Sequence, residues 1–164
     1  MPINTSELEF GEEPINGQEY IWRITGVWVK KSLNTGSLYI NMNAVVADGP
    51  SMGFSARMPM IMLYSPANRD KTKQYVGEAR QKLAKLAGIA PKTVLLPQRA
   101  NDNTETLAGL LNNLFIAKAK WVEAKTGGDG REYEAHFEVG NIIRRVEADE
   151  IADDGVDYAA FFEE

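Results

Sequence analysis

Aromatic and basic side chains gather on the β-branched stretches of this chain and on the turns between them. Flat aromatic rings can stack on nucleobases, and Lys and Arg side chains can hold the phosphates of a single strand. Such contacts need no fixed base sequence, because every base has a π-face. The residues whose types and positions suit this chemistry are Trp28, Lys30, Lys31, Tyr39, Arg57, Lys118, Lys120, Trp121, Lys125, Arg131 and Tyr133.

Catalytic groups are sparse in the sequence. His136 is the only histidine and cysteine is absent, so no His/Cys zinc site can form, and no motif places a nucleophile beside His136. The segment 127–130 lacks the Lys-Ser/Thr of a phosphate-binding loop and indicates a turn. A metal-dependent nuclease remains an alternative, because three acids alternate along one predicted strand: Glu132, Glu134 and Glu138. Alternate acids are more typical of a solvated face, so we expect neither enzyme activity nor a metal or other cofactor.

The charges of the chain are segregated. Residues 147–164 contain eight acids and no base, and residues 1–19 contain five acids and no base. The segment 20–146 therefore holds all 18 basic residues against ten acids, a net charge of +8, although the whole chain carries −5. A basic body of this kind is typical of a polyanion binder.

The acidic C-terminal segment also carries aromatic residues, which solubility alone does not call for. Its acids can compete with DNA for a basic groove in a salt-dependent way, and its rings can dock in apolar pockets of partner proteins. A merely solubilising terminus is the alternative interpretation. The residues predicted to bind partners are Asp153, Asp154, Asp157, Tyr158, Phe161 and Phe162.

Three strands are predicted in the first half of the chain. Residues 20–31 are β-branched and aromatic, with a bulge at Gly26. Residues 54–64 predict a third strand with Pro59 at an edge or a bulge. The strand between them, 37–47, alternates: one face carries Leu38, Ile40, Met42, Ala44 and Val46, and the other carries Tyr39, Asn41 and Asn43.

The second half predicts one main helix and two further strands. The helix covers 73–87, with Thr72 as its N-cap and Gly88 as its C-terminal cap. A mixed insert follows over 89–113, with a short helix over 104–111. The remaining strands are expected over 114–125 and 131–139, joined by a hairpin loop, and a short segment 141–146 ends before the acidic tail.

This order of elements is that of the OB-fold, a mainly β, five-stranded barrel with a helix between strands 3 and 4. The loops after its first and fourth strands frame a groove for oligonucleotides. Another five-stranded α+β topology would have the same order. In either case Trp22 and Trp121 fit the core as well as a stacking surface, whereas Tyr39 and Trp28 favour a functional role.

Length and composition bound the remaining possibilities. A chain of 164 residues predicts one domain, 20–146, between an N-terminal arm over 1–19 and a disordered acidic interaction tail over 147–164. No apolar run approaches the ~18 residues of a membrane span, and the first residues lack the features of a signal peptide. The absence of cysteine fits a reducing compartment, so we expect a cytoplasmic protein without a membrane partner.

Two stretches and the tail give the chain a resemblance to the OB-fold single-stranded DNA-binding proteins, especially those of bacteriophages. The stretches are YIWRITGVWVKKSLNTGSLYINMNAVVADGP (20–50) and AKWVEAKTGGDGREYEAHF (119–137). The resemblance implies a protein that coats single strands during DNA replication, recombination and repair, in the host cytoplasm if phage-encoded. It also implies that the tail recruits replication or recombination proteins, and that the groove residues include Trp28, Lys30, Lys31, Tyr39, Lys118, Lys120 and Tyr133.

The chain departs from that family in two places. Bacterial members end on a Phe, whereas Glu163 and Glu164 follow Phe162 here. The insert 89–113 is longer than a minimal OB-fold needs, so it is expected to cover the barrel or to form the contact of a homo-oligomer. An OB-like protein–protein adaptor that does not bind DNA is the alternative function, and its main element would be the tail.

Overall fold

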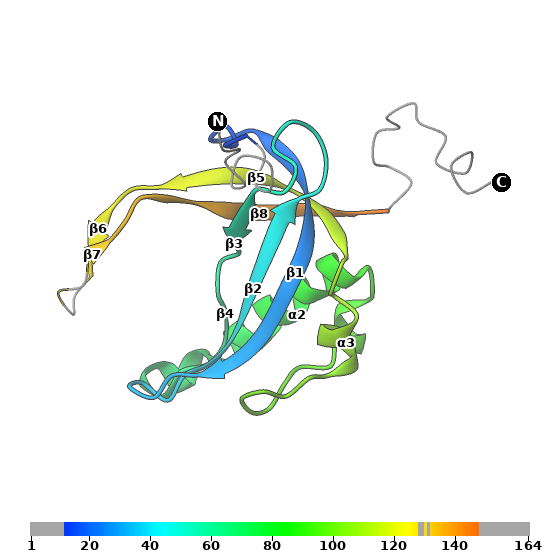
Figure 1. Cartoon of the computed structure of the whole chain (residues 1–164). Helices are drawn as coiled ribbons and strands as arrows, with labels where there is room; N and C mark the ends of the chain where they lie inside the picture. Colours follow the sequence, from blue (N-terminus) through cyan, green and yellow to red (C-terminus); the bar gives the residue numbers. More distant parts are fainter. Residues whose placement is uncertain (1–11, 128–129, 131, 148–164) are drawn as a thin grey trace.

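The structure is a computed structural model that describes residues 12–127, 130 and 132–147. Figure 1 shows a curved sheet with its helices on one side and a hairpin that projects away from the rest. The strands are β1 (Glu19–Lys31), β2 (Leu38–Val46), β3 (Ser55–Arg57), β4 (Ile61–Tyr64), β5 (Leu114–Val122), β6 (Lys125–Thr126), β7 (Glu132–Tyr133) and β8 (His136–Val146). The helical elements are η1 (Pro66–Lys71), α2 (Thr72–Ala87), η2 (Pro91–Thr93) and α3 (Glu105–Ala108).

The strands close into a barrel. β1 pairs antiparallel with β2 along one edge and with β5 along the other. β8 pairs antiparallel with β5 and parallel with β3, where Arg57 lies opposite Glu138, and β3 pairs with β2. The cycle β1-β2-β3-β8-β5 is therefore a closed five-stranded barrel of the OB type, with α2 between the third and fourth barrel strands. The predicted fold class is confirmed.

Alternation in β2 separates the core from the outer face, as predicted. Ile40, Met42, Ala44 and Val46 are buried, and the residues between them are half-buried. Trp22 and Phe115 are the largest fully buried side chains, and the indole Nε1 of Trp22 donates a hydrogen bond to the Ala117 carbonyl at 2.9 Å. Trp22 thus belongs to the core, because its single donor is satisfied inside the barrel.

A bulge in β1 lies where Gly26 predicts one. The pairing register with β2 shifts between Ile24 and Gly26, so Thr25 is the extra residue. The bulge keeps Val27 and Val29 on the core side of β1 and leaves Trp28 and Lys30 on the outer face. The outer face of the first hairpin therefore depends on this one irregularity.

Helix α2 packs against β4 and β8 and buries Ala79, Leu83 and Leu86. Gly88 ends it in the left-handed conformation (φ 71°), as predicted. The prediction of Thr72 as N-cap is wrong: Thr72 is the first helical residue, and its hydroxyl donates to the Arg69 carbonyl at 2.7 Å. The N-cap is Lys71, the last residue of η1, and its side chain makes no capping hydrogen bond.

The predicted third strand is two strands. Met58 still donates its N–H to the Met42 carbonyl at 2.9 Å, but Pro59 has no N–H and the ladder stops there. β3 pairs with β8 and closes the barrel, whereas β4 runs beside the far end of β2 and leads to α2. The break at 58–60 thus lets one segment serve both the barrel and the helix connection.

The last two strands also differ from their predicted bounds. The strand expected over 114–125 ends at Val122, and that expected over 131–139 is divided at 134–135 into β7 and β8. The segment 141–146, expected to be separate, continues β8. Among the described residues, β6 and β7 pair with each other and with no other strand, so their hairpin leaves the barrel as a separate arm (Figure 1).

The insert 89–113 covers the free edge of β1. Asn112 donates its N–H to the Ile24 carbonyl at 2.8 Å, and Asn101 donates its N–H to the Val29 carbonyl at 3.0 Å. Its helix α3 is shorter than the predicted 104–111, although Thr104 caps it by accepting a hydrogen bond from Leu107 N–H. Of the two predicted roles for the insert, the structure shows that it covers the barrel.

The N-terminal arm is tied to the barrel over its described part, 12–18. Gly17 donates its N–H to the Ala119 carbonyl at 2.8 Å, and the side chain of Asn16 accepts a hydrogen bond from Trp121 N–H. Residues 1–11 and the predicted tail beyond Glu147 lie outside the described residues. Within the described residues, no helix is long and apolar enough to cross a membrane.

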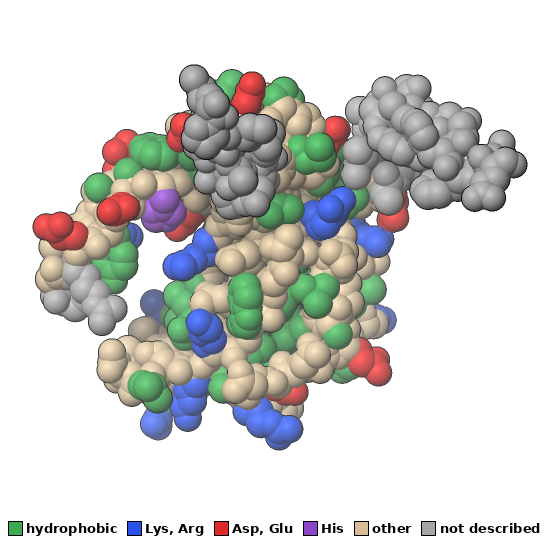
Figure 2. All heavy atoms as spheres, viewed as in Figure 1, with side chains coloured by type: hydrophobic (Ala, Val, Ile, Leu, Met, Phe, Trp, Pro, Cys, Tyr) green, Lys and Arg blue, Asp and Glu red, His purple; other side chains and the backbone are tan. Residues whose placement is uncertain are grey.

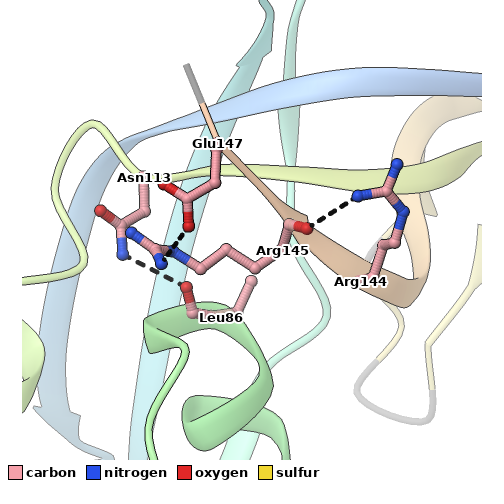
Figure 3. Close-up of polar contacts among 5 residues, drawn as sticks. All are labelled: Leu86, Asn113, Arg144, Arg145 and Glu147. Atoms are coloured by element: carbon pink, nitrogen blue, oxygen red, sulfur yellow. Dashed lines mark hydrogen bonds and ion pairs between the residues drawn. The ribbon is translucent and has the colours of Figure 1, made fainter. Parts of the chain in front are cut away.

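The end of β8 lies beside the end of α2 (Figure 3). The Arg145 guanidinium lies over Gly88, where an added Cβ would come within 2.9 Å of Nη1, and it pairs with Glu147 at 2.7 Å. Asn113 donates to the Leu86 carbonyl at 3.2 Å, one of the carbonyls that a helix end leaves without an intrahelical partner. A cation is favoured at a helix C-terminus, so Arg145 joins the last barrel strand to the helix electrostatically.

Candidate nucleic-acid interface

The outer face of β1 and β2 carries the aromatic and basic residues that the sequence predicts for stacking. Trp28 lies opposite Asn41, and Lys30 lies opposite Tyr39. Trp28 is 46% exposed and Lys30 is exposed, while Tyr39 is half-buried. Opposite residues in a ladder have side chains about 5 Å apart, so these four side chains form one continuous patch.

Gly26 fixes the position of the Trp28 ring. A Cβ at Gly26 would lie 2.3 Å from Cη2 of Trp28, which means that the indole rests directly on the glycine backbone. Only glycine leaves this space. One ring face is thus covered by the strand, and a large part of the indole remains in solvent, where it can stack on a base.

A row of polar side chains continues this face around the barrel. The register places Asn43 opposite Arg57, Arg57 opposite Glu138, and Glu138 opposite Lys120. Arg57 is exposed and lines a hollow of about 550 Å³ with Asn43, Tyr133 and His136. The row connects the first hairpin to the projecting arm.

The loop after β1 is a closed turn rather than an open loop. Ser32 donates its N–H to the Ser37 carbonyl at 2.9 Å, and Gly36 donates its N–H to the Ser32 carbonyl at 2.8 Å with a positive φ of 72°. Both bonds hold the turn at the end of the basic pair formed by Lys30 and Lys31, which are exposed. The backbone next to Lys30 and Lys31 is therefore held in one conformation.

The arm formed by β6 and β7 lines the other side of the hollow beside Arg57, which we call the groove. In the arm, Lys125 pairs with Tyr133, and Tyr133 is 44% exposed. Figure 2 shows an open gap between the arm and the barrel, with Lys and Arg side chains on the barrel side and acids on the arm. Glu132 and Glu134 line the hollow, so its charge is mixed. Arg131, predicted to bind DNA, lies outside the described residues.

His136 stands where the arm joins the barrel. Its Nδ1 lies 2.8 Å from the Glu134 carbonyl oxygen and its Nε2 lies 2.9 Å from Glu138 Oε1. The bond to the Glu134 carbonyl, and then that to Glu138, raise the pKa of His136 above its usual 6.5, against smaller opposing effects of burial and of Arg57. His136 is thus a groove-edge histidine whose protonation adds positive charge beside Arg57.

Trp121 and the β5 lysines lie apart from the Trp28 patch. Trp121 is half-buried and packs edge-on against Phe137, with ring centroids 4.8 Å apart, so it supports the base of the arm. Lys118 and Lys120 are exposed on β5, where Lys118 lies opposite Glu19 and Lys120 opposite Glu138. Lys120 joins the polar row, while Lys118 stands beyond it.

The three acids considered for a metal-dependent nuclease do not lie on one strand. Glu132 and Glu134 belong to the arm, whereas Glu138 belongs to the barrel and pairs with His136. The described residues contain no group of three or more His, Asp or Glu side chains that could hold a metal ion.

Sequence reasoning missed two parts of the interface. Glu138 was considered only as a metal ligand, although its register with Arg57 places it in the polar row. The insert 89–113 is expected only to cover the barrel or to form an oligomer contact, whereas its segment 101–103 lies beside Trp28. No local signal marks either one, because both depend on pairing between segments distant in the sequence.

The fold and the exposed groove define an OB-type barrel with an aromatic and basic outer face. No protein-family model matches the chain, and no curated protein matches its sequence.

Proposed function

We propose that this protein is a non-enzymatic single-stranded DNA-binding protein that coats exposed strands during DNA replication, recombination and repair. The observation that carries the proposal is the outer face of β1 and β2, where Trp28, Lys30 and Tyr39 stand at adjacent register positions and Trp28 also lines a hollow. Rings and cations in one exposed patch suit a ligand that offers bases and phosphates together.

The mechanism needs no chemical step. Bases stack on Trp28 and Tyr39, while Lys30, Lys31 and Arg57 hold the backbone phosphates, which releases counterions and makes binding salt-dependent. The contacts address π-faces and phosphates, so most of the affinity is independent of sequence. A duplex hides its base faces, so the same surface favours single strands.

The acidic tail completes the proposal. Its residues Asp153, Asp154 and Asp157 compete with DNA for the basic groove, and Tyr158, Phe161 and Phe162 recruit replication or recombination proteins. We propose that the protein acts in the cytoplasm, or in the host cytoplasm if it is phage-encoded.

Tryptophan fluorescence of the full chain tests the proposal. Trp22 is fully buried and Trp121 packs in the arm base, so Trp28 is the indole placed to report on a stacked base. Addition of a dT oligomer should quench the fluorescence at low salt, less so at high salt, and Trp28→Phe should remove most of the quenching. In a direct binding assay, Trp28→Ala should cost about 1–3 kcal/mol, the value of one stacked base.

The matched control is Ile89→Ala, which truncates another exposed apolar side chain, just beyond α2. It should leave DNA affinity unchanged. Absence of any binding to dT at low salt would refute the proposal and would favour the protein–protein adaptor, which the tail would serve alone.

A further inference from the structure

A second hollow borders the stacking face on the side of the insert. It measures about 230 Å³ and lies between Trp28 on β1 and the segment 101–103. This volume is below the ~300–1,000 Å³ of pockets that enclose drug-sized ligands, so it suits a single small ring system. The hollow adjoins the proposed strand-binding face, because Trp28 belongs to both.

The apolar wall of the hollow is unusually exposed. Trp28 is 46% exposed and Leu111 is 48% exposed, and both line this one hollow together with the buried Leu107. Exposed large apolar side chains that gather at one concave site mark a binding surface more often than chance exposure does. The wall therefore suits the flat face of an aromatic ligand.

The opposite wall is polar and its hydrogen-bonding capacity is unused. The side-chain amides of Asn101 and Asn103 make no hydrogen bond within the described residues. Asp102 is half-buried, and its Oδ2 accepts one bond from Gln98 N–H at 3.0 Å, which leaves further acceptor capacity on the carboxylate. Two amides and a carboxylate can read the edge of a base.

This wall is also held in place before any ligand arrives. Asn101 adopts a left-handed conformation (φ 62°) and its N–H bonds to the Val29 carbonyl, while Asp102 N–H bonds to the Arg99 carbonyl at 3.2 Å. Thr104 donates its hydroxyl to the Leu95 carbonyl at 2.8 Å. Because the backbone of this wall is already fixed, only side-chain entropy is lost on binding, which favours recognition.

We infer that this hollow holds one nucleobase of the bound strand, and that it prefers a base with an exocyclic amino group over thymine. The carboxylate of Asp102 accepts hydrogen bonds from an amino group and repels the carbonyl oxygens that thymine presents. An acid here would oppose a phosphate, so a base is the part of the strand that fits. The inference rests on the proposed function and adds a base preference to it.

The test uses the full chain and short labelled dT oligomers that carry a single central dA, dC or dG. The oligomers with an amino base should bind roughly fivefold or more tightly than all-dT, the lower range for one specific base contact. Asp102→Asn keeps an acceptor for Gln98 N–H but removes the charge, so it should abolish the preference while affinity for all-dT persists. Asn103→Ala should reduce the preference independently.

The matched control is Asp70→Asn, which removes one exposed acid from η1, outside the hollow. It should leave the preference intact. An excess of free deoxynucleoside monophosphate should displace no labelled oligomer. Displacement already at concentrations similar to that of the oligomer would show that the hollow binds free nucleotides rather than a base of the strand, and would overturn the inference.

Other outcomes separate this inference from the proposed function. Equal affinity for all oligomers, with all-dT still bound, would overturn the base preference alone. A preference that survives both Asp102→Asn and Asn103→Ala would overturn its assignment to this hollow. Failure to bind any oligomer would instead refute the proposed function.

Discussion

At the scale of single residues, the interface depends on how neighbours position a side chain. Trp28 rests on Gly26, and His136 is held between the Glu134 carbonyl and Glu138. In both cases the functional group is exposed but its orientation is fixed by a contact that the backbone supplies. Substitutions at the supporting residues are therefore as informative as substitutions at the functional ones.

Gly26→Ala should weaken DNA binding by displacing the Trp28 ring, although residue 26 itself makes no contact with the DNA. The new Cβ would lie 2.3 Å from the Trp28 ring, and since the ring is the movable partner, the indole shifts and the fold persists. The affinity for dT should fall toward that of Trp28→Ala, with little change in Tm, measured by anisotropy and thermal unfolding. The double variant Gly26→Ala/Trp28→Ala should bind no worse than Trp28→Ala, because both changes remove one interaction. An additive loss would contradict this account.

The pKa of His136 should be raised in the folded protein. The chain has one histidine, so the Cε1–H proton of its ring gives a single resonance that can be followed by NMR. Its pKa should lie above 6.5 and should fall in Glu138→Gln, because the carboxylate favours the protonated ring.

The raised pKa of His136 predicts how the stability of the fold and the affinity for DNA depend on pH. Protonation is favoured in the folded state, so the contribution of His136 to stability is fully present below pH 6.5 and is lost as pH rises through the folded-state pKa. The side chain is 44% exposed, so this contribution is small. Affinity for DNA should also decline over that pH range, and His136→Gln should remove this decline. A pKa at or below 6.5 would contradict the geometry.

At the scale of elements, three segments lie around the proposed strand-binding face: the turn after β1, the β6–β7 arm and the insert along β1. The turn after β1 is closed by two backbone hydrogen bonds, whereas β6 and β7 form a two-stranded sheet of their own over their described residues. The insert along β1 supplies the second hollow. The helix α2 takes no part in the groove and instead supports the barrel through β4, β8 and the contact between Arg145 and Gly88.

Gly88→Ala at the cap of α2 and Gly77→Ala inside the helix should change the free energy of unfolding in opposite directions. Gly88→Ala introduces a left-handed alanine and a Cβ that meets Arg145 at 2.9 Å, so it should destabilise the fold by about 1–2 kcal/mol. Gly77→Ala lies inside the helix with nothing within 4 Å, so it should stabilise by up to about 1 kcal/mol. For a chain of this size each kcal/mol moves Tm by about 2–4 °C. If both variants changed Tm in the same direction, the capping role of Gly88 would be contradicted.

At the scale of the whole molecule, the charges are divided between a basic body and acidic ends. The segment 20–146 carries +8, while the residues from 147 onward carry eight acids. The described groove has acids of its own on the arm, so its field is weaker than the net charge suggests. Competition between the tail and DNA would therefore be decided over the whole surface rather than by one ion pair.

Neutralisation of the tail should strengthen DNA binding. In the full chain, replacement of Asp153, Asp154 and Asp157 by Asn removes three competing charges. The affinity for dT should rise at low salt, and the gain should shrink at high salt because screening already weakens the competitor. Asp48→Asn, a charge change in the β2–β3 turn, serves as the control. Equal affinities of the tail variant and the parent at low salt would exclude competition.

The sequence by itself determined the periodic features. Alternation in β2 predicted its buried and outer faces, Gly88 predicted the end of α2, and the order of elements predicted the OB-type barrel. The first two depend on neighbours within a few residues, so local chemistry is enough, whereas the order of elements also fits another α+β topology until the strand pairing closes the barrel. The functional role expected for Trp28 stays a prediction, and its place on the outer face of β1 came from the structure.

Only the tertiary structure decided which outer residues meet. The division of 54–64 into β3 and β4 follows from the need to pair with β8 and then to reach α2, and the sequence shows only Pro59. The ambiguity at Trp22 was resolved by a carbonyl 95 residues away. The hollow beside Trp28 likewise joins β1 to a segment more than 70 residues distant. Long-range pairing sets such contacts, because register between strands is fixed by the closed barrel and not by any one strand.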